Sequence, residues 1–165
     1  MTETIPQPAD RGEVTLRDVT GEDLPIFYEH QMDPLATQMA AFASRERDAF
    51  MAHWTKILAN SGIIKKTIRC DGLVAGNISC FEQLGEREVG YWLGREFWGK
   101  GIATRALSEF LGQVSIRPLF ARVAKHNLGS KRVLEKCGFV VSGEGSFSLD
   151  PGGSKIEEYI LKLSQ

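Results

Sequence analysis

Hydrophobic positions along the chain recur with two different periods, and these periods predict its strands and helices. Apolar and polar residues alternate over residues 14–19, which predicts a strand, and the polar run at 20–23 offers a cap for a helix that begins near Leu24. From Ser44 to Leu58 the apolar residues recur at steps of three and four, which predicts a second helix.

The centre of the chain predicts a β-hairpin. Two apolar-rich segments, 63–70 and 73–81, flank Asp71-Gly72, a two-residue sequence that strongly favours a tight turn. The remaining pattern predicts strands over 89–93, 119–124, 139–141 and 156–163, with helices over 102–114 and 130–137. We therefore expect an α/β protein of the α+β type, with a mixed, mainly antiparallel central sheet of about seven strands flanked by about four helices.

Length and composition indicate one globular domain. The chain has 165 residues, of which 42% are hydrophobic and 25% charged, as in ordinary folded proteins. We expect a flexible polar leader over residues 1–12 and a single domain over 13–165. No segment has the apolar run of a signal peptide or of a membrane span, which predicts a cytoplasmic protein without membrane partners.

Charge and metal-ligand patterns exclude several classes of function. The formal net charge is −1, so no overall field would attract nucleic acid or an anionic surface, and a polyanion would need a local site. The three cysteines include no pair at the spacing of a zinc or redox site, and the three histidines share no ligand spacing. We expect no metal and a reducing environment.

The segment 91–104 carries the clearest chemical signal. A predicted strand runs into a glycine-rich turn and then a helix, an arrangement whose free N–H groups and helix dipole favour an anion such as phosphate. The segment contains the start of a nucleotide-triphosphate loop, but Gly101 stands where that motif needs a hydroxyl for magnesium, and Thr104 stands where a dinucleotide motif needs glycine. A tight connection without a ligand is the other interpretation.

Two motifs in the second half of the chain resemble one family. Residues 98–103, Trp-Gly-Lys-Gly-Ile-Ala, resemble the acyl-CoA pyrophosphate loop Gln/Arg-x-x-Gly-x-Gly/Ala of the GNAT family of N-acetyltransferases, with Trp98 departing from the first position. Residues 127–139 are similar to the second hallmark of that family, and the run Tyr-Trp-Leu at 91–93 resembles its RimJ/RimL branch. The resemblance covers roughly 14–163 and implies the GNAT (acyl-CoA N-acyltransferase) fold.

The resemblance implies a site for acetyl-CoA that needs no metal, beside a strand that separates from its neighbour. The backbone groups of Trp92, Leu93 and Gly94 would bond the pantetheine amides. Asn127 would bond the pantetheine arm, and Lys131 would reach the phosphates. The pyrophosphate would lie on the N–H groups of Trp98, Gly99, Lys100, Gly101, Ile102, Ala103 and Thr104. Asn127 equally suits a helix N-cap, and lysines at these positions equally suit a solvated surface.

Acetyl transfer needs a neutral amine, because an ammonium group has no lone pair with which to attack a thioester. Glu88, which enters the strand before the loop, is the predicted general base, acting through a water. Ser130 is the predicted partner of the departing CoA thiolate, since Leu134 stands where many members of the family have a proton-donating Tyr. Structural roles at a hairpin end and in a first helical turn are the alternatives.

The predicted function is an acetyl-CoA-dependent N-acetyltransferase that moves the acetyl group directly to a primary amine. The alternative is an acetyl-CoA-binding module with weak or lost catalysis, and a P-loop nucleotide hydrolase is disfavoured by Gly101. The amine acceptor would be a peptide N-terminus, a polyamine or another small amine, and no motif selects among them. The protein would act as a monomer or homodimer.

Overall fold

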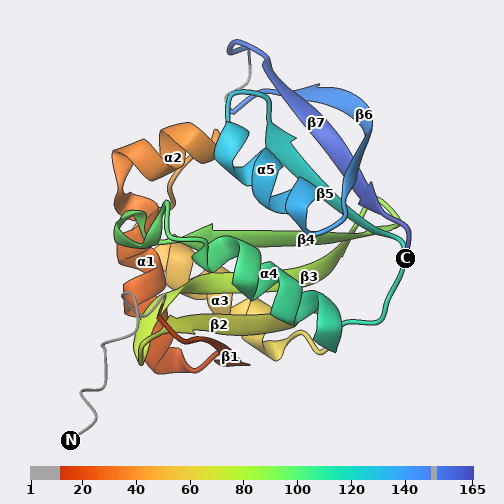
Figure 1. Cartoon of the computed structure of the whole chain (residues 1–165). Coiled ribbons are helices and arrows are strands. Elements are labelled where there is room, and N and C mark those ends of the chain that lie inside the picture. Colours follow the sequence, from red (N-terminus) through yellow and green to blue (C-terminus); the bar gives the residue numbers. More distant parts are fainter. Residues whose placement is uncertain (1–11, 150–151) are drawn as a thin grey trace, which may run out of the picture.

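The structure is a computed structural model that describes residues 12–149 and 152–165. Apart from Gly12, the predicted polar leader lies outside the described residues. The seven strands (Figure 1) are β1 (Val14–Asp18), β2 (Ile64–Cys70), β3 (Leu73–Gln83), β4 (Glu86–Leu93), β5 (Leu119–Ala124), β6 (Val140–Phe147) and β7 (Ile156–Leu163). The helices are α1 (Leu24–Met32), α2 (Pro34–Ala40), α3 (Arg47–Ala59), α4 (Ile102–Gln113) and α5 (Leu128–Lys136), with 3-10 turns η1 (Gly21–Asp23) and η2 (Arg95–Phe97).

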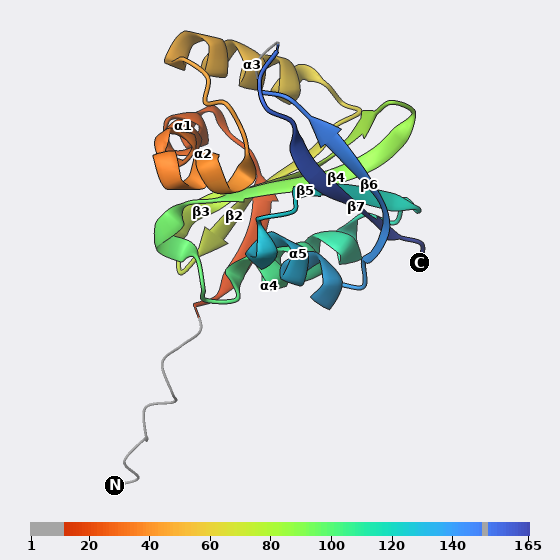
Figure 2. The same ribbon diagram turned by 90° about the horizontal axis from the view of Figure 1, so that it is seen from above.

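The strands form one mixed sheet in the order β1-β2-β3-β4-β5-β7-β6. Among the described strands, β4 and β5 are parallel and every other neighbouring pair is antiparallel. Figure 2 shows α1, α2 and α3 over one face of this sheet and α4 and α5 over the other. The predicted architecture is therefore confirmed.

Two details differ from the sequence-based prediction. Helix α2 was not expected, because a helix of seven residues offers too few apolar positions for its period to be recognised. Its local signals are Pro34 in the first turn and Asp33 as the N-cap, whose side chain accepts a hydrogen bond from the Leu35 N–H. Strand β6 also runs beyond the predicted end at residue 141 to Phe147.

The main core lies between the sheet and α4. Ile78 from β3, Leu107 and Phe110 from α4, Leu119 from β5 and Leu161 from β7 are all fully buried there. A smaller apolar cluster holds α1 and α3 against the opposite face, and consists of Leu24, Phe27, Phe50 and Trp54. These two layers fix the sheet from both sides, because each buried aliphatic or aromatic side chain contributes about 1.5–3 kcal/mol to folding.

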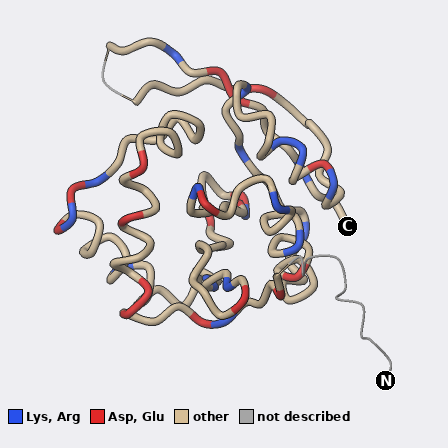
Figure 3. Tube along the Cα trace, turned by 60° about the vertical axis from the view of Figure 1, so that its left-hand side comes forward, with Lys and Arg blue, Asp and Glu red and all other residues tan. Residues whose placement is uncertain are grey.

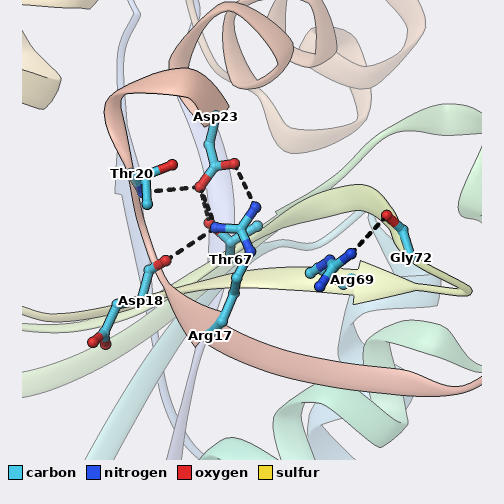
Figure 4. A network of polar contacts seen from close by, with 7 residues as sticks. All are labelled: Arg17, Asp18, Thr20, Asp23, Thr67, Arg69 and Gly72. Carbon is cyan, nitrogen blue, oxygen red and sulfur yellow. Dashed lines mark hydrogen bonds and ion pairs between the residues drawn. The ribbon is translucent and has the colours of Figure 1, made fainter.

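A buried carboxylate joins the start of the chain to the sheet. Asp23 accepts two hydrogen bonds of 2.7 Å from the Arg17 guanidinium, one from Thr67 Oγ1 at 2.7 Å and one from the Thr20 N–H at 3.0 Å (Figure 4). Burial raises the pKa of this carboxyl, but the hydrogen bonds from Arg17, Thr20 and Thr67 outweigh burial and hold the pKa at about 2. Asp23 is therefore ionised and anchors the entry to α1.

The separation of β4 from β5 creates the space for a site. One pair, Glu88 opposite Phe120, joins these parallel strands, whereas β4 pairs with β3 along its whole length. Beyond Glu88 the strands part, and N–H and C=O groups on the facing edges lose each other as partners. None of the helices in 12–149 and 152–165 has the length and apolar content needed to cross a bilayer.

Candidate active site

A cavity of about 510 Å³ lies where β4 and β5 separate, bordered by α2, by the start of α4 and by one face of α5. It is lined by residues from four parts of the chain: Ala36, Met39, Ala40, Tyr91, Trp92, Leu93, Phe97, Trp98, Gly99, Gly101, Ile102, Ala103, Thr104, Asn127, Gly129, Ser130, Arg132, Val133 and Lys136. A volume of this size is in the range of sites for small molecules and cofactors.

The cavity brings together most of the residues predicted to hold a cofactor. These are Trp92, Leu93, Trp98, Gly99, Gly101, Ile102, Ala103, Thr104, Asn127 and Ser130. Four of the predicted site residues are not in its lining, namely Glu88, Gly94, Lys100 and Lys131.

The backbone groups of Gly94, which were predicted to bond the pantetheine amides, have partners within the protein. Its N–H donates to the Ala75 carbonyl at 2.9 Å, and its own carbonyl accepts from the Phe97 N–H at 2.9 Å. Both backbone groups are therefore engaged inside the protein. An added Cβ at Gly94 would also approach His30 Nε2 to 2.7 Å, which gives this glycine a packing role.

The glycine-rich loop ends in a helix start that is open to the cavity. Gly99 and Gly101 have φ values of 73° and 75°, a left-handed backbone that favours glycine. Gly101 is the N-cap of α4, so no side chain caps the first N–H groups of this twelve-residue helix. The loop is tied to β4 because the Trp98 indole N–H donates to the Leu93 carbonyl at 3.1 Å. This arrangement suits an anion.

Two basic residues of α5, Arg132 and Lys136, are in the cavity lining, and Lys131, which was predicted to reach the phosphates, is not. Both line the cavity from α5, whereas Lys131 pairs with Glu135 at 3.3 Å and lies over the Tyr159 ring at 5.2 Å. The signal was present in the sequence, because residues three and four apart share one face of a helix. Positions 129, 132, 133 and 136 form that face.

The other Lys and Arg residues of the described chain are not in the cavity lining. Figure 3 shows Lys and Arg interspersed with Asp and Glu along the described trace, in keeping with the net charge of −1. Lys100 is exposed, and Arg95 forms an ion pair of 2.9 Å with Asp33 beside α2. An anion in the cavity would therefore depend on local groups.

Two hydroxyl groups meet inside the cavity. The Tyr91 O–H donates to Ser130 Oγ at 2.9 Å, and burial raises the pKa of Tyr91, an effect that the Ser130 hydroxyl partly offsets. The Ser130 N–H in turn donates to Asn127 Oδ1 at 3.2 Å. Asn127 is thus the N-cap of α5 and also part of the cavity wall, so both interpretations of this residue hold geometrically.

Glu88 lies at the point where β4 and β5 begin to separate. Only 4% of its surface is exposed, and Oε1 accepts from Arg122 Nε at 3.1 Å. Arg122 Nη1 also donates to Glu158 Oε1 at 2.8 Å, so two buried carboxylates share one guanidinium. Burial raises the pKa of Glu88, and Arg122 offsets this only in part. A raised pKa makes the carboxylate a stronger base.

The Trp92 indole has a buried N–H, and its ring lies on the face of β4 opposite to the Tyr91 side chain. Its ring packs edge-on against Phe42 with centroids 5.6 Å apart, and Nε1 is buried with no hydrogen-bond partner among the described residues. A buried donor without a partner costs about 1–3 kcal/mol. On the cavity side, the Gly loop and the basic residues of α5 together fit a polar, phosphate-bearing ligand.

Helix α2 closes one side of the cavity through fixed contacts at both ends. The Arg95 ion pair holds Asp33 before the helix, and His126 Nε2 lies 3.0 Å from the Gln38 carbonyl near its end. In the part of the chain that the structure describes, no group of three or more His, Cys, Asp or Glu residues could hold a metal ion. Leu134 is 2% exposed, so this position faces the core and not the cavity.

Comparisons with known proteins agree with this geometry. The family model for the acetyltransferase (GNAT) domain matches residues 13–140. The Putative ribosomal N-acetyltransferase YdaF of Bacillus subtilis is 28% identical over 118 residues, which cover 67% of this chain and 64%, less than two thirds, of YdaF. The Uncharacterized N-acetyltransferase p20 of Bacillus licheniformis is 26% identical over 164 residues, covering 91% of this chain and 92% of p20.

Solved structures share the fold at low sequence identity. Spermidine N-acetyltransferase from Vibrio cholerae, in complex with CoA and spermine, superposes with a TM-score of 0.80 at 17% identity, covering 92% of this chain and 95% of that one. Mycobacterium smegmatis RimJ, in complex with CoA-disulfide, superposes with a TM-score of 0.75 at 20% identity, covering 93% and 83%. With the family model covering most of the described sheet, the predicted family is confirmed, and the chain belongs to the acetyltransferase (GNAT) domain family.

Proposed function

We propose that the protein is an N-acetyltransferase that moves the acetyl group of acetyl-CoA directly to a primary amine within a ternary complex. The observation that carries this proposal is the cavity at the separation of β4 and β5, with an open helix start at one wall and the Tyr91–Ser130 hydroxyl pair at another. The complexes of related folds with CoA support acetyl-CoA as the co-substrate. We also propose that the reaction needs no metal.

The residues around the cavity suggest how acetyl-CoA would lie. We assign its pyrophosphate to the N–H groups of the loop and the start of α4, with charge from Arg132 and Lys136. We assign the pantetheine arm to the edge of β4 at Trp92 and Leu93 and to Asn127. The Leu93 carbonyl already accepts from the Trp98 indole, but a carbonyl oxygen has two lone pairs and can accept once more.

Ser130 is the group that we assign to the departing sulfur. The amine nitrogen attacks the thioester carbonyl, the N–C bond forms, and the C–S bond breaks with its electron pair left on sulfur. The Ser130 O–H would donate a hydrogen bond to this thiolate, which then takes a proton from solvent. The buried Leu134 leaves no tyrosine for that task at the family's usual position.

Glu88 is the group that we assign as the general base, acting through a water. It would receive the proton that the amine loses as the N–C bond forms. Its support is its location at the point where the strands separate and its raised pKa, which keeps it a better proton acceptor than an exposed carboxylate. Arg122 fixes the carboxylate in place at 3.1 Å.

The acceptor that we propose is a primary amine of a peptide N-terminus, a polyamine or another small molecule. The names of the relatives include a ribosomal, a spermidine and a RimJ acetyltransferase, which supports this range and our placement in the RimJ/RimL-like branch. We further propose one domain over residues 13–165 that acts in the cytoplasm as a monomer or homodimer.

Turnover with a panel of amines tests the proposal. The full chain is mixed with acetyl-CoA and, separately, peptides with free N-termini, polyamines and aminoglycosides, and both CoA thiol release and the acetylated amine are measured. We expect one amine class to give equal amounts of the two products without added metal. Acetyl-CoA binding without turnover on any amine would favour the binding module, and magnesium-dependent nucleotide hydrolysis would favour a P-loop enzyme.

A further inference from the structure

The Tyr91 side chain reaches Ser130 across the cavity. Its hydroxyl lies 2.9 Å from Ser130 Oγ, although 39 positions separate the two residues in the sequence. Tyr91 comes from β4 and Ser130 from the first turn of α5, and both line the cavity. The contact therefore depends on the tertiary fold and joins two walls of the cavity.

The direction of this hydrogen bond follows from the acidity of the two hydroxyl groups. A phenol is a much stronger acid than an aliphatic hydroxyl, so Tyr91 donates and Ser130 accepts. Burial raises the pKa of Tyr91, which keeps the phenol protonated at neutral pH and preserves its role as the donor. The hydrogen of the Ser130 hydroxyl is then free for a second partner.

Ser130 is also fixed at its backbone, so its hydroxyl has little freedom. The Ser130 N–H is held by Asn127 Oδ1 at 3.2 Å, and Oγ is held by Tyr91. A hydroxyl that accepts a hydrogen bond becomes a stronger donor to the next group, because neighbouring hydrogen bonds polarise one another. The pair thus presents one oriented O–H to the cavity.

We propose that Tyr91 is a positioning residue for acetyl transfer, which holds Ser130 Oγ so that the Ser130 O–H points at the sulfur of bound acetyl-CoA. This inference rests on the proposed function. When the C–S bond breaks, the electron pair stays on sulfur and Ser130 stabilises the anion, while Tyr91 keeps its own proton. The thiolate then takes a proton from water, and the proton of the amine leaves through Glu88.

The ionisation of bound CoA tests this arrangement without any acceptor. The thiol of CoA in complex with the protein is titrated by its ultraviolet absorbance, with the desulfo-CoA complex subtracted to remove the tyrosines. We expect Ser130→Ala to raise the pKa of the bound thiol by about one unit, a tenfold smaller thiolate fraction. Tyr91→Phe should raise it in the same direction by a smaller amount, and the double variant should not exceed Ser130→Ala.

Kinetics with an active amine give the second readout. Tyr91→Phe should lower kcat about three- to tenfold with little change in the KM for acetyl-CoA, as expected for an interaction that strengthens in the transition state. The matched control is Tyr159→Phe, a half-buried tyrosine of β7 outside the cavity lining, which should change neither readout. Both variants remove one oxygen and keep the ring, and CoA affinity near that of the wild type confirms their folding.

Two results would overturn the inference. One is a bound-thiol pKa and a kcat in Tyr91→Phe equal to those of the wild type, while Ser130→Ala changes both. The other is a double variant whose two losses add, because that means the hydroxyls act independently. A wild-type protein that binds no CoA would instead refute the proposed function and this inference with it.

Discussion

Gly76 of β3 leaves the space that the carbonyl group of Trp92 occupies in β4. A Cβ added at Gly76 would overlap the Trp92 carbonyl oxygen and would lie 3.0 Å from both the Trp92 carbonyl carbon and Leu93 Cα. Gly76 pairs with Leu93, and this close approach sets the position of the β4 segment that lines the cavity. The missing side chain on β3 therefore determines where the edge of β4 lies.

Gly76→Ala is expected to disturb both stability and cofactor binding. The methyl group must push β4 away from β3, and overpacking of this kind costs about 1–3 kcal/mol. The measurement is the free energy of unfolding in urea together with acetyl-CoA affinity by calorimetry. Gly90→Ala is the matched control in β4, since its Cβ would meet only Phe81 at an ordinary 3.7 Å. Equal behaviour of the two variants would contradict this role of Gly76.

Gly101→Val is expected to weaken CoA binding by about tenfold or more while the protein stays folded. A β-branched residue at a φ of 75° is strained by about 1–3 kcal/mol and would rotate the first N–H groups of α4 away from the cavity. Affinity is measured by calorimetry and the fold by circular dichroism. Gly112→Ala, in the last turn of the same helix with open space around the added Cβ, should bind CoA normally. Wild-type affinity in Gly101→Val would mean that the loop is only a connection.

Arg132→Ala and Lys136→Ala are each expected to lower CoA affinity about three- to tenfold. Both residues line the cavity, so each substitution removes a positive charge near the phosphates. Lys131→Ala removes the same charge from the opposite side of α5, where it pairs with Glu135, and serves as the control. Raising the salt concentration should shrink the differences between these variants and the wild type. A larger effect of Lys131→Ala would contradict the assignment.

Glu88→Gln is expected to slow turnover most at low pH. A positioned general base contributes about 10²–10⁴-fold, and raising the pH supplies neutral amine from solution, so the deficit should narrow. The pH profile of kcat/KM with an active amine measures this. Glu158→Gln changes the other carboxylate on Arg122 and should leave the shape of the profile unaltered. A loss below about threefold for Glu88→Gln over pH 6 to 10 would give Glu88 a structural role.

Asp23→Asn is expected to destabilise the fold at neutral pH but not in strong acid. The pKa of Asp23 is lowered from 3.8 to about 2, so its ionised form stabilises the protein by about 2 kcal/mol above pH 4. This contribution is lost as the pH falls through about 2, because Asp23 is then protonated in the folded state as well as in the unfolded state. Urea unfolding at several pH values measures the difference. Asp18→Asn, whose carboxylate is 87% exposed, should destabilise the protein much less than Asp23→Asn at neutral pH.

The parts of the site that local sequence specifies could be predicted. Gly99 and Gly101 mark the loop because their positive φ values favour glycine, and Asn127 marks a helix start because its side chain caps the next turn. The strand and helix periods likewise predicted the order of the strands and helices along the chain, apart from α2. These features depend on neighbours within a few residues.

The parts that depend on tertiary packing could not be predicted. The contact between Tyr91 and Ser130 joins residues 39 positions apart, and the separation of β4 from β5 beyond Glu88 was expected from the family resemblance and not from any local pattern. No local pattern reports either one. Lys131 is a different case: it lies outside the cavity lining, and helix spacing places Arg132 and Lys136 on the cavity face together with positions 129 and 133.

Thermal unfolding with CoA and with acetyl-CoA, in a buffer that contains a chelator, tests the central claim most directly. Ligand at about a hundredfold over its Kd stabilises the folded state by about 2.7 kcal/mol, which raises the Tm of a domain of this size by about 5–10 °C. We predict such a rise for the wild type with either ligand and a much smaller one for Gly101→Val. A wild-type Tm that does not move at millimolar CoA would contradict the account.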